Sequence, residues 1–574
     1  MMKELIIAIE EEIGNPGLFV GRRKELNYFL DWTEKVKKEL SHSTAILSRK
    51  KRGKTALVQR LCNILHTQND PMLIPFYFKI EEGKISQLNF SDIFYRSLLS
   101  QYLGFKFRNI NFSSAILPFN MLEELAKNDK TLLPDISGME QIIEKNNPDL
   151  AWKHAREAGH RISALKGERI IQVIDEFQFL NEYIYTDNTH TNRIELATFY
   201  QSTAESKVSP QIITGSYIGW LSTIIGKMVS RYDEYYLENF TDEEALEAVY
   251  NYSNIYEEEV SYESACYMTG VCENDPYYIA RMFESRYEGK DLTSIPSIIE
   301  TLKYETTYPT GRIAKMWLEY IWDAIEKVND KNAKKIILYL AKYGEEERTR
   351  EQILKDLNLD MDDDELETKL HKLAKADIIA YGSTNYDFKG LGDNIFEIVF
   401  RKMYEKEIEK VDVKIIEEEI NKQLLSIQKQ ISYFKGMAAE YRIINRLLFA
   451  EIKKIPLENI VYNHQEGMVL GRFASMKKRL FHIDQERGLE ADIFCESEDK
   501  KGTDFVVEVK DWKDVVSTEK VKQFIEKKKL LEVYLTKSTG YIFYSENGLT
   551  KEQEELLAAD GIMYTDAGRL SYLS

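Results

Sequence analysis

Residues Thr44–Arg60 read TAILSRKKRGKTALVQR and contain the pattern from which the architecture of the first half of the chain can be predicted. A short apolar run leads into a loop that ends in Gly53-Lys54-Thr55, and residues with helical spacing follow at once. A phosphate-binding loop requires strand, loop and helix in this order, because the loop N–H groups and the helix N-terminus bind the phosphates. The pattern predicts that Lys54 contacts the β- and γ-phosphates of a nucleotide and that Thr55 binds Mg²⁺.

The loop departs from the motif G-x-x-x-x-G-K-[ST] at Ser48, where the motif has glycine. That glycine shapes the turn, and serine is the next smallest polar residue, so we expect some strain there without loss of the site. The next residues, Arg49 to Arg52, are all basic. They either add positive potential over a triphosphate or form a solvated surface run, and the sequence favours neither.

A second stretch, Arg169–Leu180, reads RIIQVIDEFQFL and supports the same site. Its β-branched apolar residues suit a buried parallel strand, and the strand ends in Asp175-Glu176. Two adjacent acids at the end of a buried strand are costly unless they bind something. In a P-loop NTPase the first acid, here Asp175, supports Mg²⁺, and the second, Glu176, acts on the attacking water.

Further short apolar runs complete the expected sheet. Met72–Ile80 and Gln211–Tyr217 are predicted strands, and Ser216 at the end of the second could sense the γ-phosphate or cap a helix. Tyr235–Phe240 is a predicted last strand, and Arg231, just before it, could face a phosphate or a neighbouring subunit. Strands that alternate with helices predict a mainly parallel, three-layer α/β sheet.

Length, charge and cysteine use limit the remaining possibilities. A chain of 574 residues is too long for one core, so we expect three or four domains. The net charge of −18 argues against a polycation that coats nucleic acid along its whole length, although it allows a local basic cleft. No apolar run approaches the ~18 residues of a membrane span. The cysteines show no CxxC pair, so we expect a cytoplasmic protein with reduced thiols and no membrane partner.

The middle of the chain changes character twice. Residues 241–330 are expected to be all-helical, with a helix starting after Asp275-Pro276. In residues 331–402 we expect helices at 331–343, 349–357 and 363–376, followed by extended runs at Ile378–Tyr381, Tyr386–Phe388 and Ile395–Phe400. Helices followed by a hairpin resemble a winged helix, for which DNA binding and domain packing are equally good interpretations. Residues 403–430 form a charged helical connector.

A second chemical site is expected near the C-terminus. Phe505–Lys510 reads FVVEVK, so Glu508 and Lys510 share one face of a strand that its valines mark as buried. Upstream, Ala491–Cys495 is another predicted strand and contains Asp492. The polar segment between them suits a hairpin that brings Asp492 beside Glu508.

Two carboxylates on neighbouring strands suit Mg²⁺ or Mn²⁺. The predicted ligands are Asp492, Glu508 and the carbonyl of Val509, and Glu440, on a preceding helix, would hold a metal-bound water or complete the site. Lys510 would orient or deprotonate the attacking water. The alternative is a salt-bridged Glu508–Lys510 pair in a purely structural sheet.

Two resemblances follow from these motifs. Residues 19–26 (FVGRRKEL), the SRKKRGKT loop, VIDEF, IITGSY and DPYYI resemble the archaeal-type P-loop ATPases of the STAND/AAA+ branch. Residues 436–523 resemble the PD-(D/E)xK nuclease superfamily. The first resemblance implies an ATP site formed by residues Ser48, Gly53, Lys54, Thr55, Asp175, Glu176, Ser216 and Arg231. Cys272-Glu273-Asn274-Asp275 departs from the family's Gly-rich approach to the lid proline, which affects the expected adenine contact.

Together the motifs and resemblances imply an α/β multidomain protein. The expected parts are a P-loop ATPase core at 1–240 with a helical insertion at about 81–165, a helical lid at 241–330, a winged helix at 331–402, the connector at 403–430, and a restriction-endonuclease-like domain at 431–574.

The function implied by this layout is an ATP-controlled, metal-dependent DNA nuclease that acts in defence against phage or mobile DNA. DNA, further copies of the chain and a protein trigger are the expected partners, and ATP with Mg²⁺ (or Mn²⁺ at the nuclease site) the expected cofactors. The alternatives are an ATP-driven switch whose nuclease-like domain only binds DNA or protein, and a motor that remodels DNA ends.

Overall fold

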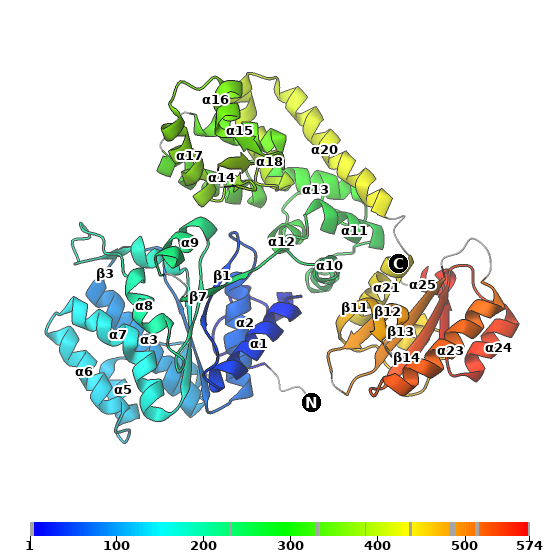
Figure 1. Cartoon of the computed structure of the whole chain (residues 1–574), viewed down its shortest axis with the longest axis horizontal. Helices are drawn as coiled ribbons and strands as arrows, with labels where there is room; N and C mark the ends of the chain where they lie inside the picture. Colours follow the sequence, from blue (N-terminus) through cyan, green and yellow to red (C-terminus); the bar gives the residue numbers. More distant parts are fainter. Residues whose placement is uncertain are drawn as a thin grey trace. The chain divides into compact units, whose positions relative to one another are not determined.

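The computed structural model in Figure 1 describes residues 5–228, 231–328, 332–384, 386–434, 439–482, 488–499, 501–510 and 516–571. The chain divides into two compact units. Unit 1 comprises Met1–Asn239, Asp275–Arg281 and Lys303–Glu418, and unit 2 comprises Phe240–Asn274, Met282–Leu302 and Glu419–Ser574. No helix among the described residues is long and apolar enough to cross a membrane.

Unit 1 is built around a five-stranded parallel sheet of order β2-β4-β6-β1-β7. Its strands are β1 (Ser43–Leu47), β2 (Leu73–Lys79), β4 (Arg169–Asp175), β6 (Gln211–Thr214) and β7 (Tyr232–Tyr236). The predicted parallel α/β sheet is therefore confirmed, with one correction to the position of a strand. The last strand lies at Tyr232–Tyr236 and not at Tyr235–Phe240, because β7 is an edge strand in which only Tyr232 is buried, so no apolar run marks it.

The sheet lies between two apolar cores, as the three-layer prediction requires. On one face, Ile46, Val173 and Ile212 pack with residues of α1 (Arg23–Lys37) and α2 (Lys54–Gln68). On the other, their strand neighbours Ala45, Ile174 and Ile213 pack with residues of α3 (Gln87–Phe107) and α7 (Pro148–Lys166). Alternate residues of a strand point to opposite faces, which is why consecutive apolar residues belong to different cores.

The segment 81–165 is helical, as expected, and part of it forms one layer of the sandwich. Its elements are β3 (Ile85–Ser86), α3, α4 (Ile110–Ser113), α5 (Phe119–Ala126), α6 (Leu132–Glu144) and α7. Helix α3 packs on β2 and α7 packs on β4. Further along the chain come η2 (Phe177–Asn181), β5 (Ile184–Tyr185), η3 (Ala197–Tyr200), α8 (Gln201–Ala204) and α9 (Ile218–Lys227).

The rest of unit 1 holds the expected small helices and a small sheet of order β8-β10-β9. The elements are α14 (Arg312–Val328), α15 (Ala333–Tyr343), β8 (Arg348–Thr349), α16 (Arg350–Leu357), α17 (Asp363–Lys375), β9 (Ala380–Tyr381), β10 (Asp387–Lys389) and α18 (Asn394–Phe400). The expected extended run Ile395–Phe400 is wrong, because it forms helix α18. The Asp393 carboxylate accepts the Phe396 N–H at 2.8 Å and caps this helix. A π-helical turn (Arg401–Glu405), α19 (Lys406–Glu409) and α20 (Val413–Phe434) form the helical connector.

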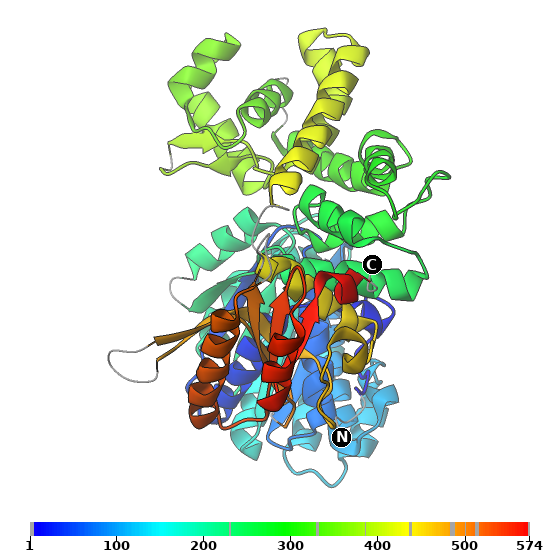
Figure 2. The same ribbon diagram turned by 90° about the vertical axis from the view of Figure 1, so that its right-hand side faces the viewer.

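Unit 2 contains a five-stranded mixed sheet of order β11-β12-β13-β14-β15. The strands are β11 (Phe473–His482), β12 (Gly488–Ser497), β13 (Asp504–Lys510), β14 (Thr539–Ser545) and β15 (Met563–Asp566). β12 is antiparallel to β11 and β13, whereas β13, β14 and β15 run parallel. Helices α23 (Thr518–Tyr534) and α24 (Lys551–Ala559) connect the parallel strands and lie side by side on one face of the sheet, in orange and red in Figure 2.

The helices around this sheet include part of the segment 241–330. They are α10 (Asp242–Tyr256), α11 (Tyr262–Val271), α21 (Ala439–Ile452), α22 (Leu457–Ile460) and α25 (Ala567–Ser571). α10 packs on α21, where the rings of Tyr250 and Phe449 meet edge to face at 5.0 Å. The segment 241–330 is helical, as predicted, with α12 (Pro276–Phe283) and α13 (Ile295–Thr307) completing it, but its residues are divided between the two units.

Candidate functional site

The loop between β1 and α2 encloses the Lys54 ammonium. Lys54 Nζ donates to the Ser48 carbonyl at 2.6 Å, to the Ser48 hydroxyl at 3.0 Å and to the Arg49 carbonyl at 2.9 Å. All three acceptors are neutral, and burial lowers the pKa of Lys54 to about 8. A buried cation held by neutral dipoles is stabilised further by an anion, so the environment of Lys54 fits a phosphate group.

The backbone of the loop shows where its strain lies. Gly53 has a φ of 88°, which favours glycine, and it directly precedes α2. The strain that we expected at Ser48 falls instead at Lys51, whose φ is 70°. Ser48 does not appear among the residues with positive φ, so the missing glycine imposes no left-handed backbone at that position.

Asp175, at the end of β4, joins the loop to two neighbouring strands. Thr55 Oγ1 donates to Asp175 Oδ2 at 2.8 Å, so the two residues predicted to support Mg²⁺ are in contact. Tyr77 OH donates to the same oxygen at 3.0 Å, and the Thr214 hydroxyl donates to Oδ1. A hydroxyl and a carboxylate are hard oxygen ligands that fit Mg²⁺. Tyr77 and Thr214 were missed, because a polar residue within a strand is recognisable as part of a site only once the strand order is known.

Glu176 lies beside this cluster in a left-handed backbone conformation, with φ of 57°. The Ser216 hydroxyl donates to Glu176 Oε1, and the Ser216 N–H donates to Oε2 at 3.1 Å. Gln178 Nε2 also donates to Oε2, at 2.6 Å. The structure therefore brings Ser216 and Glu176 together, and Ser216 holds the carboxylate in place.

Arg231 does not join the other predicted nucleotide residues. It precedes Tyr232, which pairs with Ser43 at the beginning of β1, whereas the loop with Lys54 follows the end of β1. Because the two strands are parallel, Arg231 lies at the amino ends of the strands, whereas the loop with Lys54 lies at their carboxyl ends. Arg231 pairs there with Glu205 at 3.4 Å. The predicted contact of Arg231 with a phosphate in its own chain is therefore wrong.

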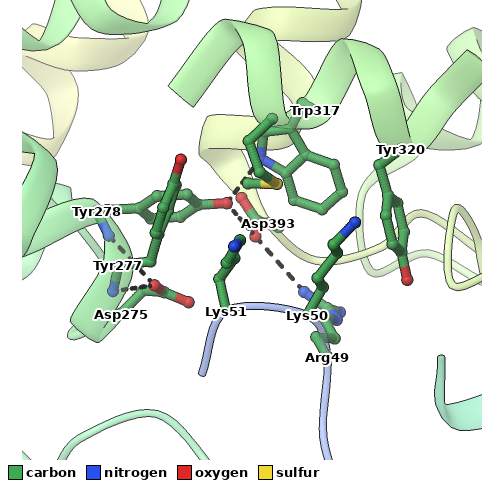
Figure 3. A pocket seen from close by; sticks show the side chains of 10 residues that line it. Arg49, Lys50, Lys51, Asp275, Tyr277, Tyr278, Trp317, Tyr320 and Asp393 are labelled. Atoms are coloured by element: carbon green, nitrogen blue, oxygen red, sulfur yellow. Dashed lines mark hydrogen bonds and ion pairs between the residues drawn. The ribbon is translucent and has the colours of Figure 1, made fainter. Parts of the chain in front are cut away.

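The basic run in the loop is engaged by acids of unit 1. Arg49 pairs with Asp393 at 3.5 Å and donates to the Leu391 carbonyl at 2.6 Å. Arg52 lies 3.9 Å from Asp275, so the two arginines of the run are held by acids, whereas Lys51 is exposed. Figure 3 shows the pocket on this side of the loop. It is lined by Arg49, Lys50, Lys51, Asp275, Tyr277, Tyr278, Met316, Trp317, Tyr320 and Asp393.

Asp275 is the cap of α12 in this pocket. Its carboxylate accepts the N–H groups of Tyr277 at 2.8 Å and Tyr278 at 3.3 Å. Burial raises the pKa of Asp275 to about 6 despite the nearby Arg52. The predicted helix start is thus confirmed, with Pro276 as the first residue of the helix.

Arg22, in the segment FVGRRKEL, holds the backbone of the loop between β1 and α2 by hydrogen bonds. Its side chain is almost fully buried, and it donates to the carbonyls of Arg52 at 3.0 Å and Glu238 at 2.8 Å. Arg22 thereby ties the phosphate-binding loop to the segment that follows β7. An arginine that directly precedes a helix carries no sequence signal that it will reach two distant carbonyls.

The second predicted site lies in unit 2, on the antiparallel pair β12 and β13. Ile493 is opposite Val507, which places Asp492 and Glu508 next to each other on adjacent strands. Lys510 Nζ lies 2.6 Å from Glu508 Oε1 and 3.5 Å from Asp492 Oδ2. The predicted hairpin and its shared face are therefore present, with Asp492, Glu508 and Lys510 brought together.

Two backbone and side-chain contacts complete this cluster. The Val509 N–H donates to Asp492 Oδ2 at 2.8 Å, so this residue orients the carboxylate, and its carbonyl as a metal ligand remains a prediction. Lys527, on α23, contacts Glu508 Oε2 at 2.5 Å and was missed, because it is one of several lysines on a basic helix. Glu440 lies on α21, which packs on β12 and β13, but its side chain is outside the described residues.

The electrostatics of Lys510 define its role. Burial opposes its charge, but the hydrogen bond and charge of Glu508, together with Asp492, outweigh burial and raise the pKa of Lys510. Lys510 is therefore a cation at neutral pH, suited to orienting a water or a phosphate and not to removing a proton. Among the described residues no group of three or more His, Cys, Asp or Glu side chains could hold a metal, so a cation here would depend on Asp492, Glu508, backbone and water.

Comparisons with known proteins find similar folds only. No family model and no curated protein matches the chain. Among solved structures, a Walker-type ATPase of Pyrococcus abyssi is 14% identical, with 67% of this chain and 96% of that chain covered and a TM-score of 0.45. The ORC2 protein of Aeropyrum pernix is 12% identical, with 67% of this chain and 94% of that chain covered and a TM-score of 0.37.

The RuvB Holliday junction branch migration motor of Thermotoga maritima is 14% identical, with 65% of this chain and 92% of that chain covered and a TM-score of 0.29. The assignment of unit 1 as a P-loop ATPase-like α/β domain comes from its own geometry. That geometry is a parallel sheet, with Lys54 and Thr55 in the loop after β1 and Asp175 at the end of β4.

Proposed function

We propose that this chain is an ATP-regulated, metal-dependent DNA endonuclease. The observation that carries the proposal is the convergence of Asp492, Glu508 and Lys510, with the Lys510 ammonium within 3.5 Å of both carboxylates. The same chain holds Lys54 and Thr55 in a loop whose geometry fits a phosphate. A carboxylate pair with a lysine is suited to phosphodiester hydrolysis, and a phosphate-binding loop is suited to its control by ATP.

At the nucleotide site, the triphosphate would replace the neutral oxygens that hold Lys54 and accept its ammonium. Thr55 and Asp175 would hold Mg²⁺, whose charge offsets that of the phosphates. Glu176, held by Ser216, would orient the water that attacks the γ-phosphate. The chain's own residues thus supply binding, orientation and charge, which are the main protein contributions to phosphoryl transfer.

At the nuclease site, Asp492, Glu508 and the Val509 carbonyl would hold Mg²⁺ or Mn²⁺, and Glu440 would complete the site. A divalent ion bound there would lower the pKa of a water and neutralise phosphate charge. The charged Lys510 would orient that water and stabilise the negative charge that develops on the phosphate. Water would add to phosphorus as the P–O bond to one sugar breaks; one of its protons would pass through solvent to the leaving oxygen, and the other would remain on the product phosphate or be released to solvent.

The segment 331–402, which we interpret as a winged helix, and the helices of 241–330 would pass the nucleotide state to the nuclease. Several basic residues on α16 and α17, among them Arg350, Lys369 and Lys372, are candidate DNA contacts. Control by ATP would keep the nuclease inactive until a trigger, such as phage or other mobile DNA, is present. Assembly of several copies and a protein trigger fit the same scheme.

A rival function is an ATP-driven switch whose unit 2 binds DNA or a protein without cutting. One observation favours it: both oxygens of Glu508 are occupied by lysine ammonium groups, at 2.6 Å from Lys510 and 2.5 Å from Lys527. In this rival the cluster is a structural set of ion pairs. The two functions differ in whether Glu508 is required for cleavage.

The test is incubation of the full chain with linear and circular DNA in Mg²⁺ or Mn²⁺, with and without ATP. We expect cleavage that Glu508→Ala abolishes and that Lys54→Ala alters. Glu496→Ala is the matched control, because this exposed carboxylate lies on β12 without contacting Lys510, and it should cut like the native protein. Absence of cleavage together with DNA binding that ATP changes would support the switch.

A further inference from the structure

Glu508 is held between two cations that come from different elements. Lys510, two residues along β13, contacts Oε1 at 2.6 Å, and Lys527, on α23, contacts Oε2 at 2.5 Å. The side chains are only 12% exposed for Glu508 and 15% exposed for each lysine. Neither oxygen of this carboxylate is therefore free for a further cation in the arrangement described here.

The charges of the cluster balance. Asp492 and Glu508 contribute two negative charges, and Lys510 and Lys527 contribute two positive charges. A divalent cation that binds Glu508 would face two ammonium groups at short range, which is unfavourable at a site with little solvent. One lysine must move away from Glu508 before a divalent cation can bind.

The two lysines differ in how firmly they are held. Lys510 shares a strand with Glu508, lies between β12 and β14 in the sheet, and also contacts Asp492 at 3.5 Å. Lys527 reaches the carboxylate from a helix on one face of the sheet, and its ion pair is with Glu508. Lys527 is therefore the lysine whose departure disturbs less of the cluster.

We propose that Lys527 is a positioning residue that occupies the metal-binding oxygen of Glu508, and that a divalent cation binds by displacing it. This inference rests on the proposed nuclease function, since it assigns a step in the loading of that site. Lys527 lowers the affinity for the cation, keeps the carboxylate oriented in its absence, and so makes activity depend on divalent ion concentration.

The test is a calorimetric titration of the nucleotide-free full chain with Ca²⁺, repeated with Mn²⁺ followed by electron paramagnetic resonance. Lys527→Met keeps the aliphatic stem and removes the charge, and it should bind either ion about tenfold more tightly, because a hydrogen bond to a charged group no longer has to be broken. Lys527→Arg restores a cation and should return the affinity toward that of the native protein. The ion concentration for half-maximal DNA cleavage should fall in Lys527→Met by the same factor.

Lys528→Met is the matched control, because the neighbouring lysine pairs with Glu532 at 2.8 Å and not with Glu508. It should leave ion binding unchanged. Lys527→Gln serves as a second neutral variant if Lys527→Met does not fold. Weaker or unchanged ion binding in the folded neutral variant would overturn the role of Lys527.

Glu508→Gln separates this failure from failure of the proposed function. If Glu508→Gln removes ion binding but neutral variants of Lys527 do not strengthen it, the displacement inference is wrong and the metal site stands. Glu508→Gln is introduced both into the native protein and into Lys527→Met. If it changes ion binding in neither, Glu508 is not a metal ligand and both proposals fail.

Discussion

Replacement of Lys54 by methionine tests the nucleotide site through stability as well as through binding. Lys54 is 6% exposed and its ammonium contacts only neutral oxygens among the hydrogen bonds described above. Burial lowers its pKa from 10.5 to about 8. Methionine has a similar length, fills the same space and carries no charge, so it removes the cost of burying the ammonium without leaving a large cavity.

The size of the effect follows from the pKa. A tenfold change in proton affinity is worth about 1.4 kcal/mol, so a fall of about 2.5 (10.5 minus about 8) corresponds to a cost of about 3 kcal/mol in the empty protein. Lys54→Met removes this cost, but part of the resulting stabilisation is lost, because the carbonyls of Ser48 and Arg49 lose their donor and must bind water. We expect Lys54→Met to stabilise unit 1 by about 1–3 kcal/mol and to weaken ATP binding by at least about a hundredfold.

The assay is denaturant unfolding followed by tryptophan fluorescence, combined with calorimetric titration of ATP. Five of the six tryptophans lie in unit 1, so the fluorescence reports mainly on the unit that contains Lys54. Lys50→Met is the matched control, because Lys50 lies in the same loop and its ammonium is 4.0 Å from Glu319. The control should change stability by less than about 0.5 kcal/mol. Destabilisation by Lys54→Met, or native-like ATP affinity, would refute the reasoning.

The pH dependence of the difference in unfolding free energy between Lys54→Met and the native protein gives an independent check. Between pH 8 and 10.5 the unfolded chain still binds a proton at Lys54 that the folded protein has released, so the stability of the native protein rises with pH in that window. The advantage of Lys54→Met should therefore be fully present below pH 8 and disappear as the pH approaches 10.5. A difference that does not change with pH would mean that charge burial is not its cause.

Three further changes test the surroundings of the site and the core. Arg22→Lys keeps the charge but cannot reach both carbonyls, so ATP affinity should fall about 5- to 20-fold in a binding titration, because the carbonyl of Arg52 is no longer fixed. Tyr77→Phe removes a hydrogen bond to the buried Asp175 and should cost about 1–2 kcal/mol in denaturant unfolding. Trp152→Ala, at a fully packed position, should cost about 3–5 kcal/mol while Ca²⁺ binding by unit 2 stays unchanged.

Local patterns in the chain were sufficient wherever one segment contains the whole signal. The loop before Lys54, the buried strand that ends in Asp175-Glu176 and the FVVEVK strand each combine a structural pattern with a chemical residue. A loop between a strand and a helix, or two residues on one strand face, has its geometry fixed by a few bonds. These predictions therefore survived in the tertiary structure, including the hairpin that joins Asp492 to Glu508.

Two predicted strands were wrong, at segments whose apolar pattern did not indicate the secondary structure that forms. The edge strand at Tyr232–Tyr236 is buried on too few positions to show an apolar run. Ile395–Phe400 is apolar enough for a strand but forms helix α18, which Asp393 caps. Arg231 was expected to face a phosphate or a neighbouring subunit because it precedes the last predicted strand. Its distance from the loop depends on strand direction, which a single segment does not reveal.

Residue spacing along the chain is enough to identify the phosphate-binding-loop motif, the buried strand with two acids and the carboxylate–lysine strand, because spacing along a helix or a strand sets which residues share a face. The partners from distant segments that complete each site become visible in the folded chain and not before. Tyr77 and Thr214 reach Asp175, and Lys527 reaches Glu508, from separate elements. Strand order and helix packing set those distances, and they depend on burial of apolar surface across the whole unit.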